Sequence, residues 1–493
     1  MKPINIFLLF GLTLSIFFSS GQIENPDTHL RLTQTRLLLQ NERLGLGDEV
    51  GELMHGNVAI NHEGKRHMVY NPGQSIIFIP IYVIGNLLFS EDYNTYYFAA
   101  FMVSFVNFFI HALSAFVLFK IALKLGASKR KAYLISAFFG ITSYSFVFAQ
   151  STYEHHFESL FVLLSILNAL TKDTKNYAIK SGLMLTIGLI FRSSTILAVP
   201  GIILLFKDNL SKIKFMFSLS IGVLFVLAYN YFRFGNIIET GYSIAWSLAH
   251  PVNIDFWSFS RIPIGMLGLL ISPGKGLLFF SFTIMIAVLG MKKFWAEYKR
   301  LSMCIILITA TYLIVFSMNF AWHGSIWSFG PRYILPILPM LYLPLIFIKN
   351  SKWINITLIF SFILQMGLLT VNYKRNVLEQ HVKFNGISDI TYTSSIRNEP
   401  HLAQAKQLSI ILPKNHGELK NYQPNTPWIK EVRTASNKDV FGSSIEKNSI
   451  NFWWVRIFHW NTAWATRFIA ILVLIIGLLA ARKLINTVKH EFL

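Results

Sequence analysis

Ionisable side chains gather in one stretch of the sequence, from Asn25 to Pro80, which follows a first apolar segment and precedes a long series of others. Within it, Asp27 lies a few residues after the first apolar segment, and Arg31 follows four positions later. On a helix these two residues share a face, where an acidic and a basic side chain attract each other. A carboxylate held there could act as a general base toward the hydroxyl or amine of an acceptor. An ordinary solvated ion pair is the alternative interpretation.

A second acidic group in the same stretch contains Asp48 and Glu49 and follows two glycines. An exposed acidic turn is the simpler interpretation, and a second catalytic carboxylate is the alternative. The histidines that come next, His55, His62 and His67, have no spacing that matches HExxH or a similar metal-binding motif. We therefore expect no metal and no other cofactor, and a divalent metal stays an open alternative.

Several cationic side chains could hold the phosphate of a lipid-linked donor. Transfer from such a donor leaves an anion behind, and Arg and Lys stabilise an anion through charge-assisted hydrogen bonds. The candidates are Lys65, Arg192, Lys275 in SPGKG and Arg332 in FGPRY. SPGKG is not a phosphate-binding P-loop, which requires GxxxxGK followed by Ser or Thr. For Arg332 the alternative is a side chain that reaches lipid phosphates at the membrane surface.

Two further groups of polar residues could contact a substrate. Glu154 and His155 lie in STYEHHFES, and His323 lies in AWHGS. Each could supply an acid–base group, and solvation in a loop is the alternative for each. The sequence contains no GxGxxG dinucleotide fingerprint and no GxSxG nucleophile elbow, so it offers no support for a nucleotide-sugar fold or a serine hydrolase.

The composition indicates that these residues are carried by a membrane protein. Of the 493 residues 53% are hydrophobic, and only 14% are charged, against roughly 25% in soluble domains. The mean hydropathy is +0.48. The formal charge of +20 does not indicate nucleic-acid binding, because the Lys and Arg residues lie mostly in short connections between apolar segments, which is typical of membrane topology. We predict an all-α polytopic protein.

The positions of the basic clusters predict the topology. The apolar candidates are 4–20, 75–90, 97–122, 133–150, 157–171, 178–191, 194–206, 215–232, 264–290, 302–319, 333–348, 354–372 and 466–481. All the basic clusters fall on the cytoplasmic side only if 75–90, which contains Pro80, lies in the membrane interface instead of crossing. They also require a break between 178–191 and 194–206, near Arg192. These conditions predict about 12 spans with both termini inside.

On this topology the polar sequence faces the outside, and three regions follow. Residues 1–372 form a transmembrane domain whose first outer loop, 21–96, is catalytic. Residues 373–465 form an extracytoplasmic loop region, and 466–493 contain the last span and a cytoplasmic tail. Before the last span lie Trp453, Trp454, Trp460 and Trp464, which we interpret as an interfacial aromatic belt. The first apolar segment fits either a retained helix, which we favour, or a cleaved signal peptide.

Four stretches resemble sequence blocks of the GT-C glycosyltransferases, polytopic enzymes that take a sugar from a polyprenyl-phosphate carrier. They are PDTHLRLTQTRLLL, HEGKRHMVYNPGQSIIFIPIY, GLLISPGKGLLFFS and HGSIWSFGPRYILPILP. The chain looks most like the bacterial members grouped with protein mannosyltransferases and aminoarabinose transferases, which belong to or resemble glycosyltransferase family 39. The resemblance implies a GT-C-like helical bundle with an outer juxtamembrane helix and a C-terminal extracytoplasmic loop.

The resemblance also assigns roles to residues. It places Asp27 at the position of the catalytic carboxylate, Lys65 and Tyr70 in the stretch that lines the substrate, and Arg332 on the phosphate side. Many relatives have an acidic pair at the first position, whereas here Asp27 is followed by Thr28. This departure leaves any second carboxylate to Asp48 or Glu49 and weakens the case for a metal.

The expected function is therefore an integral-membrane glycosyltransferase in a cell membrane, by analogy the bacterial inner membrane, with its active site on the extracytoplasmic face. Its expected partners are a polyprenyl-phosphate-linked sugar and membrane lipids, and no nucleic acid. Asp27 would orient or deprotonate the acceptor, and the cations would hold the phosphate. A transporter of a lipid-linked sugar and a non-catalytic scaffold of the cell envelope are the alternatives. The sugar, the acceptor and the oligomeric state do not follow from the sequence.

Overall fold

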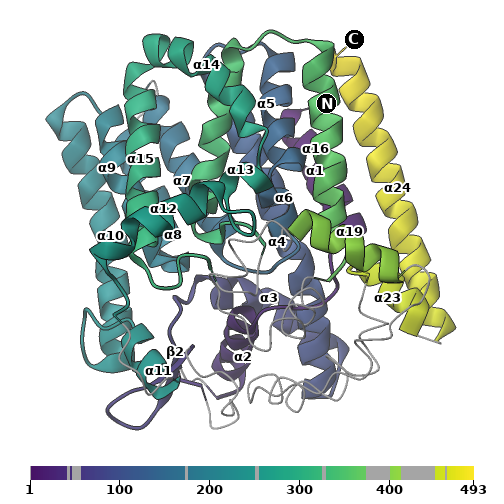
Figure 1. Ribbon diagram of the computed structural model, residues 1–493. Helices are drawn as coiled ribbons and strands as arrows, with labels where there is room; N and C mark the ends of the chain where they lie inside the picture. The colour runs from purple at the N-terminus through teal and green to yellow at the C-terminus, as the bar shows by residue number, and fades with distance from the viewer. Residues whose placement is uncertain are drawn as a thin grey trace.

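The computed structural model describes residues 2–41, 45–46, 57–172, 176–249, 255–324, 329–372, 400–411, 450–460 and 463–492. In this part of the chain nearly all regular structure is helical, and one short two-stranded hairpin accompanies the helices. The predicted all-α class is confirmed. Figure 1 shows the longer helices running side by side, with both chain termini at one end of the bundle.

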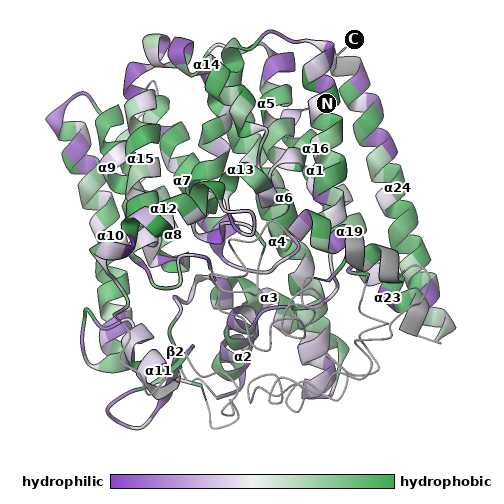
Figure 2. Ribbon diagram, in the orientation of Figure 1, coloured by the Kyte–Doolittle hydropathy of each residue, from purple (hydrophilic) through white to green (hydrophobic). Residues whose placement is uncertain are grey.

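The longest helices are apolar over most of their length. Five of the described helices are long and apolar enough to cross a membrane. They are α4 (Asp92–Lys124), α10 (Asn209–Phe234), α15 (Lys299–Met318), α16 (Lys352–Thr370) and α24 (Trp464–Phe492). Figure 2 shows hydrophobic residues along the middle of these helices and hydrophilic residues gathered at the two ends of the bundle. The chain is therefore a multi-pass membrane protein.

Shorter apolar helices fill the space between the long ones. The main ones are α1 (Pro3–Phe18), α3 (Gly73–Leu88), α5 (Lys129–Thr142), α7 (His155–Leu170), α8 (Tyr177–Phe191), α12 (Ile262–Ile271), α14 (Ile284–Glu297) and the 3-10 helix η5 (Arg332–Phe347). The shortest are α6 (Tyr144–Phe148), η2 (Ser193–Ala198), α9 (Val199–Ile202), η3 (Ile203–Leu205), η4 (Phe259–Arg261) and α13 (Leu277–Phe280). Because many of these are shorter than the roughly 20 residues that a span needs, the predicted count of 12 spans is not confirmed.

Further elements cover the end of the bundle opposite to the termini. They comprise α2 (Pro26–Asn41), the antiparallel strands β1 (Val58–Ile60) and β2 (Arg66–Met68), and α11 (Tyr242–Ala249). Two further helices follow later in the chain, α19 (Pro400–Ile411) and α23 (Trp453–Trp460). α2 packs against α3, and α3 packs against α4. The hairpin, α2 and α3 therefore form a cap on this end of the bundle.

Two of the predicted helix boundaries have different outcomes. The chain breaks at Arg192, where α8 ends and η2 begins, as the charge pattern predicted. The apolar segment 264–290, however, is not one helix: α12 ends at Ile271, and α14 begins only at Ile284. The reason lies in the sequence SPGKG, because Pro273 cannot donate the backbone hydrogen bond that a continuous helix needs.

The tryptophans before the last span do not form one interfacial belt. Trp453 is buried and donates its indole N–H to the Ile16 carbonyl at 2.6 Å, and Trp454 donates to the Phe17 carbonyl at 3.0 Å. Both carbonyls lie in the last turn of α1, where helical carbonyls have no partner within the helix. These two tryptophans therefore cap α1, whereas Trp464 is 82% exposed.

Candidate active site

The site begins with the first turn of α2. The Asn25 side chain accepts a hydrogen bond from the Thr28 backbone N–H at 2.8 Å, which is the arrangement of a helix N-cap. Pro26 follows at a position where a helix tolerates proline. Asp27 therefore lies in the first turn of α2, where the positive end of the helix dipole stabilises a carboxylate. The Asp27 side chain is nearly buried.

Contacts with Thr152 attach this turn to the connection between α6 and α7. The Thr28 hydroxyl donates to the Thr152 carbonyl at 2.9 Å, and the Gln74 amide of α3 donates to the same carbonyl at 2.9 Å. The Asn25 amide donates to the Thr152 hydroxyl at 3.1 Å. These contacts bring the start of α2 beside Glu154.

Arg31 does not form the ion pair that its spacing from Asp27 suggested. Among the described residues it pairs with Glu154, with 2.8 Å between Nη2 and Oε2, and both side chains are buried. Its guanidinium also lies over the ring of Tyr70, 4.1 Å from the centroid. Attachment of α2 to the α6–α7 connection brings Glu154 within reach of Arg31, and sequence spacing on α2 alone carries no information about this.

Tyr70 lies in the turn between β2 and α3, near both Arg31 and Asp27. Burial raises the pKa of Tyr70 well above its ordinary value, and the charge of the nearby Asp27 carboxyl raises it further. Tyr70 therefore stays protonated beside Asp27.

Arg192 enters the site from the break between α8 and η2. Its side chain pairs with Glu154, and its Nε lies 3.3 Å from Oε2 of Glu158. Glu158 also accepts from the hydroxyls of Ser194 at 2.6 Å and Tyr312 at 2.8 Å. Burial alone would raise the pKa of Glu154, but the charges of Arg31 and Arg192 more than offset it and hold that pKa below its ordinary value.

Arg332 adds a third guanidinium at the start of η5. It lies over the ring of Tyr153, 4.5 Å from the centroid, and donates to the Tyr333 hydroxyl at 3.4 Å. It forms no ion pair with any described carboxylate. A buried cation of this kind is stabilised by aromatic faces and leaves its charge available to an anionic ligand.

Hydrogen-bond donors without partners mark where a ligand would fit. Within the described part of the chain, Nε and Nη1 of Arg31 and Nε and Nη1 of Arg332 have no hydrogen-bond partner, and neither do the two ring nitrogens of His155. All three side chains are buried. Unsatisfied buried polar groups cost free energy, and a phosphate with several acceptor oxygens would satisfy them.

The remaining predicted residues belong to other parts of the described structure or lie outside the described residues, although Gly324, the neighbour of His323, packs closely against the Arg332 side chain. Lys65 is exposed in the turn between β1 and β2 and pairs with Glu63 at 2.6 Å. Lys275 is buried in the turn between α12 and α13, and its backbone N–H binds the Ser272 hydroxyl. His323 is buried beside Trp322. Asp48 and Glu49 lie outside the described residues.

Sequence reasoning named Tyr70 but missed three other tyrosines of the site. Tyr153 and Tyr333 flank the guanidinium of Arg332, and Tyr242 meets the Tyr70 ring edge to face, with centroids 6.3 Å apart. The signal available was their position next to charged residues, in TYEHH and PRY. Tyrosine is so common at membrane interfaces that this signal does not separate a binding role from an anchoring role.

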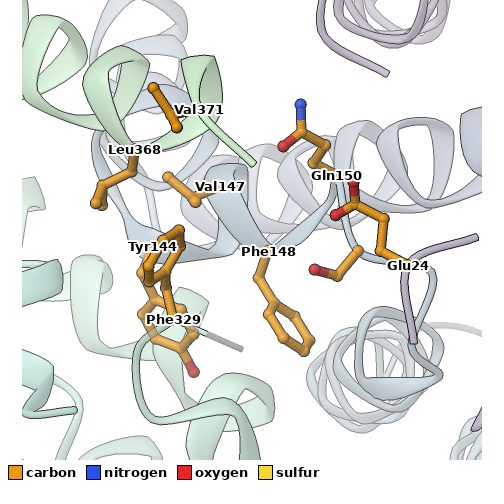
Figure 3. Close-up of a pocket in the computed structure, with 9 residues that line it drawn as sticks. Glu24, Tyr144, Val147, Phe148, Gln150, Phe329, Leu368 and Val371 are labelled. Carbon is orange, nitrogen blue, oxygen red and sulfur yellow. The ribbon is translucent and has the colours of Figure 1, made fainter. Parts of the chain in front are cut away.

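A small pocket adjoins the cluster on the side of α6. Its lining residues are Glu24, Tyr144, Val147, Phe148, Gln150, Ser151, Phe329, Leu368 and Val371. Figure 3 shows the Glu24 carboxyl and the Gln150 amide near each other, with the aromatic rings on the other side. The ring of Phe148 stacks on that of Tyr153, with centroids 5.4 Å apart. The pocket and the cluster therefore share a wall.

The described residues contain no group of three or more His, Cys, Asp or Glu side chains that could hold a metal ion. The site is instead a buried set of guanidinium, carboxyl and phenol groups.

The fold and the site together define a multi-pass helical membrane protein with a polar, arginine-rich cluster at one end of its bundle. No family of known proteins matches the sequence, and no curated protein matches it. Among solved structures, ArnT from Cupriavidus metallidurans in the apo state is similar over 83% of this chain and 68% of that chain, with 10% identity and a TM-score of 0.45. ArnT bound to undecaprenyl phosphate is similar over 86% of this chain and 80% of that chain, with 10% identity and a TM-score of 0.42.

Proposed function

We propose that the protein is an integral-membrane glycosyltransferase that transfers a sugar from a polyprenyl-phosphate carrier to an acceptor outside the cytoplasm. The observation that carries the proposal is the combination of Asp27 with the unsatisfied donors of Arg31 and Arg332 in one buried cluster. The sequence blocks that resemble GT-C glycosyltransferases contain these same residues. The acceptor is a lipid, a glycan or a protein, and the membrane is the bacterial inner membrane.

In this proposal the arginines bind the carrier phosphate. Arg31 and Arg332 each have two guanidinium nitrogens, Nε and Nη1, without a hydrogen-bond partner among the described residues, and an arginine fork matches the geometry of phosphate oxygens. Negative charge grows on the phosphate as the sugar leaves. Fixed donors in a site without water stabilise that charge more than water would. His155 supplies a further donor to the phosphate or to the sugar.

Asp27 acts as the general base. The acceptor oxygen or nitrogen attacks the anomeric carbon and loses its proton to the Asp27 carboxylate. The bond from that carbon to the phosphate oxygen breaks, and its electron pair stays on the phosphate. Attack from the face opposite to the phosphate inverts the configuration of the sugar. Tyr70 lies beside the Asp27 carboxyl, whose charge acts on the tyrosine hydroxyl.

The test is Asp27→Asn in purified protein supplied with a set of polyprenyl-phosphate sugars and candidate acceptors. Asparagine keeps the shape of the side chain and cannot take up the proton. We expect turnover to fall about 10²–10⁴-fold, which is the usual contribution of a general base, while the affinity for undecaprenyl phosphate changes little.

A matched control is Asp92→Asn, because Asp92 accepts hydrogen bonds from Tyr82, Arg36 and Gln40 at the start of α4 and takes no part in the cluster. A folded Asp27→Asn protein with unchanged turnover would remove Asp27 from the mechanism. Movement of the lipid-linked sugar across liposomes without any product would favour the transporter instead.

A further inference from the structure

Arg233, in the last turn of α10, reaches into the polar cap that covers the site. Figure 1 shows the end of α10 next to β2 and α11. The Arg233 side chain is 1% exposed. Its Nη1 donates to the carbonyls of Met68 at 2.6 Å and Tyr70 at 3.2 Å, and its Nη2 donates to the Asn230 side chain at 2.7 Å. One guanidinium nitrogen thus holds two carbonyls of the same backbone segment.

Arg233 lies among carbonyls and aromatic rings. No described carboxylate forms an ion pair with it, and its guanidinium lies 4.1 Å from the ring centroid of Tyr229 and 4.7 Å from that of Phe234. Burial of a cation is expensive, and the Nε of Arg233 has no hydrogen-bond partner among the described residues. A methionine would fill the same volume without the free-energy cost of burying a charge. The hydrogen bonds of the guanidinium to the carbonyls of Met68 and Tyr70 therefore explain the arrangement best.

The contact is reciprocal. The Asn61 amide, at the end of β1, donates to the Arg233 carbonyl at 3.0 Å. Phe234 also packs in one hydrophobic cluster with Leu30, Met68 and Tyr70. The end of α10 and the β1–β2 hairpin are therefore joined by backbone, side-chain and apolar contacts.

Tyr70, whose backbone Arg233 holds, lies next to Arg31 and Asp27. Its ring lies under the guanidinium of Arg31, 4.1 Å from the centroid, and the Asp27 carboxyl lies near enough for its charge to act on the Tyr70 hydroxyl. We propose that Arg233 is a positioning residue: by holding the backbone of Tyr70, it sets the places of Arg31 and Asp27. The proposal rests on the function assigned above, because it takes Arg31 as a ligand of the carrier phosphate.

A double-mutant cycle tests this coupling. The variants are Arg233→Lys, Tyr70→Leu and the two combined, in full-length protein in nanodiscs, with undecaprenyl phosphate as the probe. Lysine keeps the charge but has no planar fork to bridge two carbonyls. We expect Arg233→Lys to weaken binding about tenfold, and the double variant to bind no more weakly than Tyr70→Leu alone, because coupled residues are not additive.

Amide hydrogen exchange supplies a readout that does not depend on ligand binding. In Arg233→Lys we expect faster exchange in residues 66–71 and in the first turn of α2, with unchanged exchange in α14 and α15. Arg261→Lys is the matched control, since Arg261 also donates to a backbone carbonyl, that of Met318 at 3.4 Å, away from Tyr70. It should change neither measurement.

Each other result overturns a distinct claim. Losses of affinity that multiply in the double variant, unchanged affinity of Arg233→Lys, or faster exchange throughout the protein would show that Arg233 does not act through Tyr70. Failure of the wild-type protein to bind undecaprenyl phosphate would contradict the proposed function, and exchange in residues 66–71 would then still decide whether Arg233 holds this segment.

Discussion

Glu154 is the residue on which the three arginines of the site converge. It forms ion pairs with Arg31 and Arg192, and Arg332 also acts on its charge. The Glu154 carboxylate is buried away from solvent. It stays ionised because these guanidinium groups stabilise its negative charge. Loss of either charge partner from a buried pair leaves the other uncompensated and is strongly destabilising.

This arrangement predicts how stability depends on pH. Because the pKa of Glu154 is lower in the folded protein than its ordinary value of 4.5, its contribution is complete above about pH 4.5 and is lost as the pH falls through the lower folded value. We expect Glu154→Gln to be less stable than the wild type at pH 7, by about 3–5 kcal/mol, and to lose less stability on acidification. Thermal unfolding between pH 3 and pH 7 measures both effects.

Glu63→Gln serves as the comparison, because Glu63 also pairs with a cation but is exposed. Its unfolding temperature should stay close to that of the wild type, since solvent weakens exposed ion pairs. If Glu154→Gln loses stability on acidification as steeply as the wild type, other carboxyl groups control the acid transition.

The types of these residues could be read from the sequence, but their partners could not. Asp27, Arg31, Arg192 and Arg332 stood out because charged residues beside apolar segments are rare and costly. The i,i+4 rule then suggested the wrong partner for Arg31. That rule treats a helix in isolation, whereas the observed ion pair depends on how α2 lies against the connection between α6 and α7.

At the scale of elements, small residues bring α8 and α10 close together. A Cβ atom added to Gly182 of α8 would lie 2.0 Å from the Ser218 hydroxyl and 2.5 Å from the Phe215 carbonyl of α10. The Thr186 hydroxyl of α8 donates to the Ser218 carbonyl at 2.8 Å. Close approach through small residues and interhelical hydrogen bonds is the usual way in which helices associate in membranes.

We expect Gly182→Ala to destabilise the protein by about 1–3 kcal/mol, because the added methyl group must push α8 and α10 apart. The matched control is Gly367→Ala in α16, where no atom lies within 4 Å of the added Cβ. That change should be neutral or slightly stabilising, because alanine is the better helix former. Unfolding temperatures in detergent decide the matter, and equal effects of the two changes would contradict the packing argument.

Helix boundaries were predictable where charge or proline marks them. Lys180 and Lys207 required a break between them, and the structure breaks the chain at Arg192. Within 264–290 only the local sequence SPGKG indicated a break. Hydropathy is averaged over many residues and therefore showed one continuous apolar segment. Length is the weakest part of the sequence argument, since 3-10 segments such as η5 change the rise per residue.

At the scale of the whole molecule, the basic connections lie together at the end that carries the termini. The Lys131 ammonium, near the start of α5, binds the Ile348 carbonyl and the Asn350 side chain, which follow η5. The Tyr298 hydroxyl, between α14 and α15, binds the Leu125 carbonyl at the end of α4. The candidate active site lies at the opposite end (Figure 1).

This separation predicts the orientation in the membrane. The positive-inside rule places the basic end in the cytoplasm and the site outside it. A cysteine in place of Lys65, which is exposed on the β1–β2 hairpin, should react with a membrane-impermeant maleimide in intact spheroplasts. A cysteine in place of the exposed Lys349 should react only after permeabilisation. The native Cys304 is buried and should give little background, and the reverse labelling pattern would invert the topology.

The sequence by itself determined the class of the protein, the break at Arg192 and the residue types of the site. These follow from local quantities, namely hydropathy, charge and the backbone limits of proline. Only the tertiary structure decided that Arg31 pairs with Glu154, that Trp453 and Trp454 cap α1, and that Arg233 holds the backbone of Tyr70. Each of these contacts joins residues far apart in the chain. Such residues come into contact only when whole helices pack against one another, and local sequence does not determine that packing.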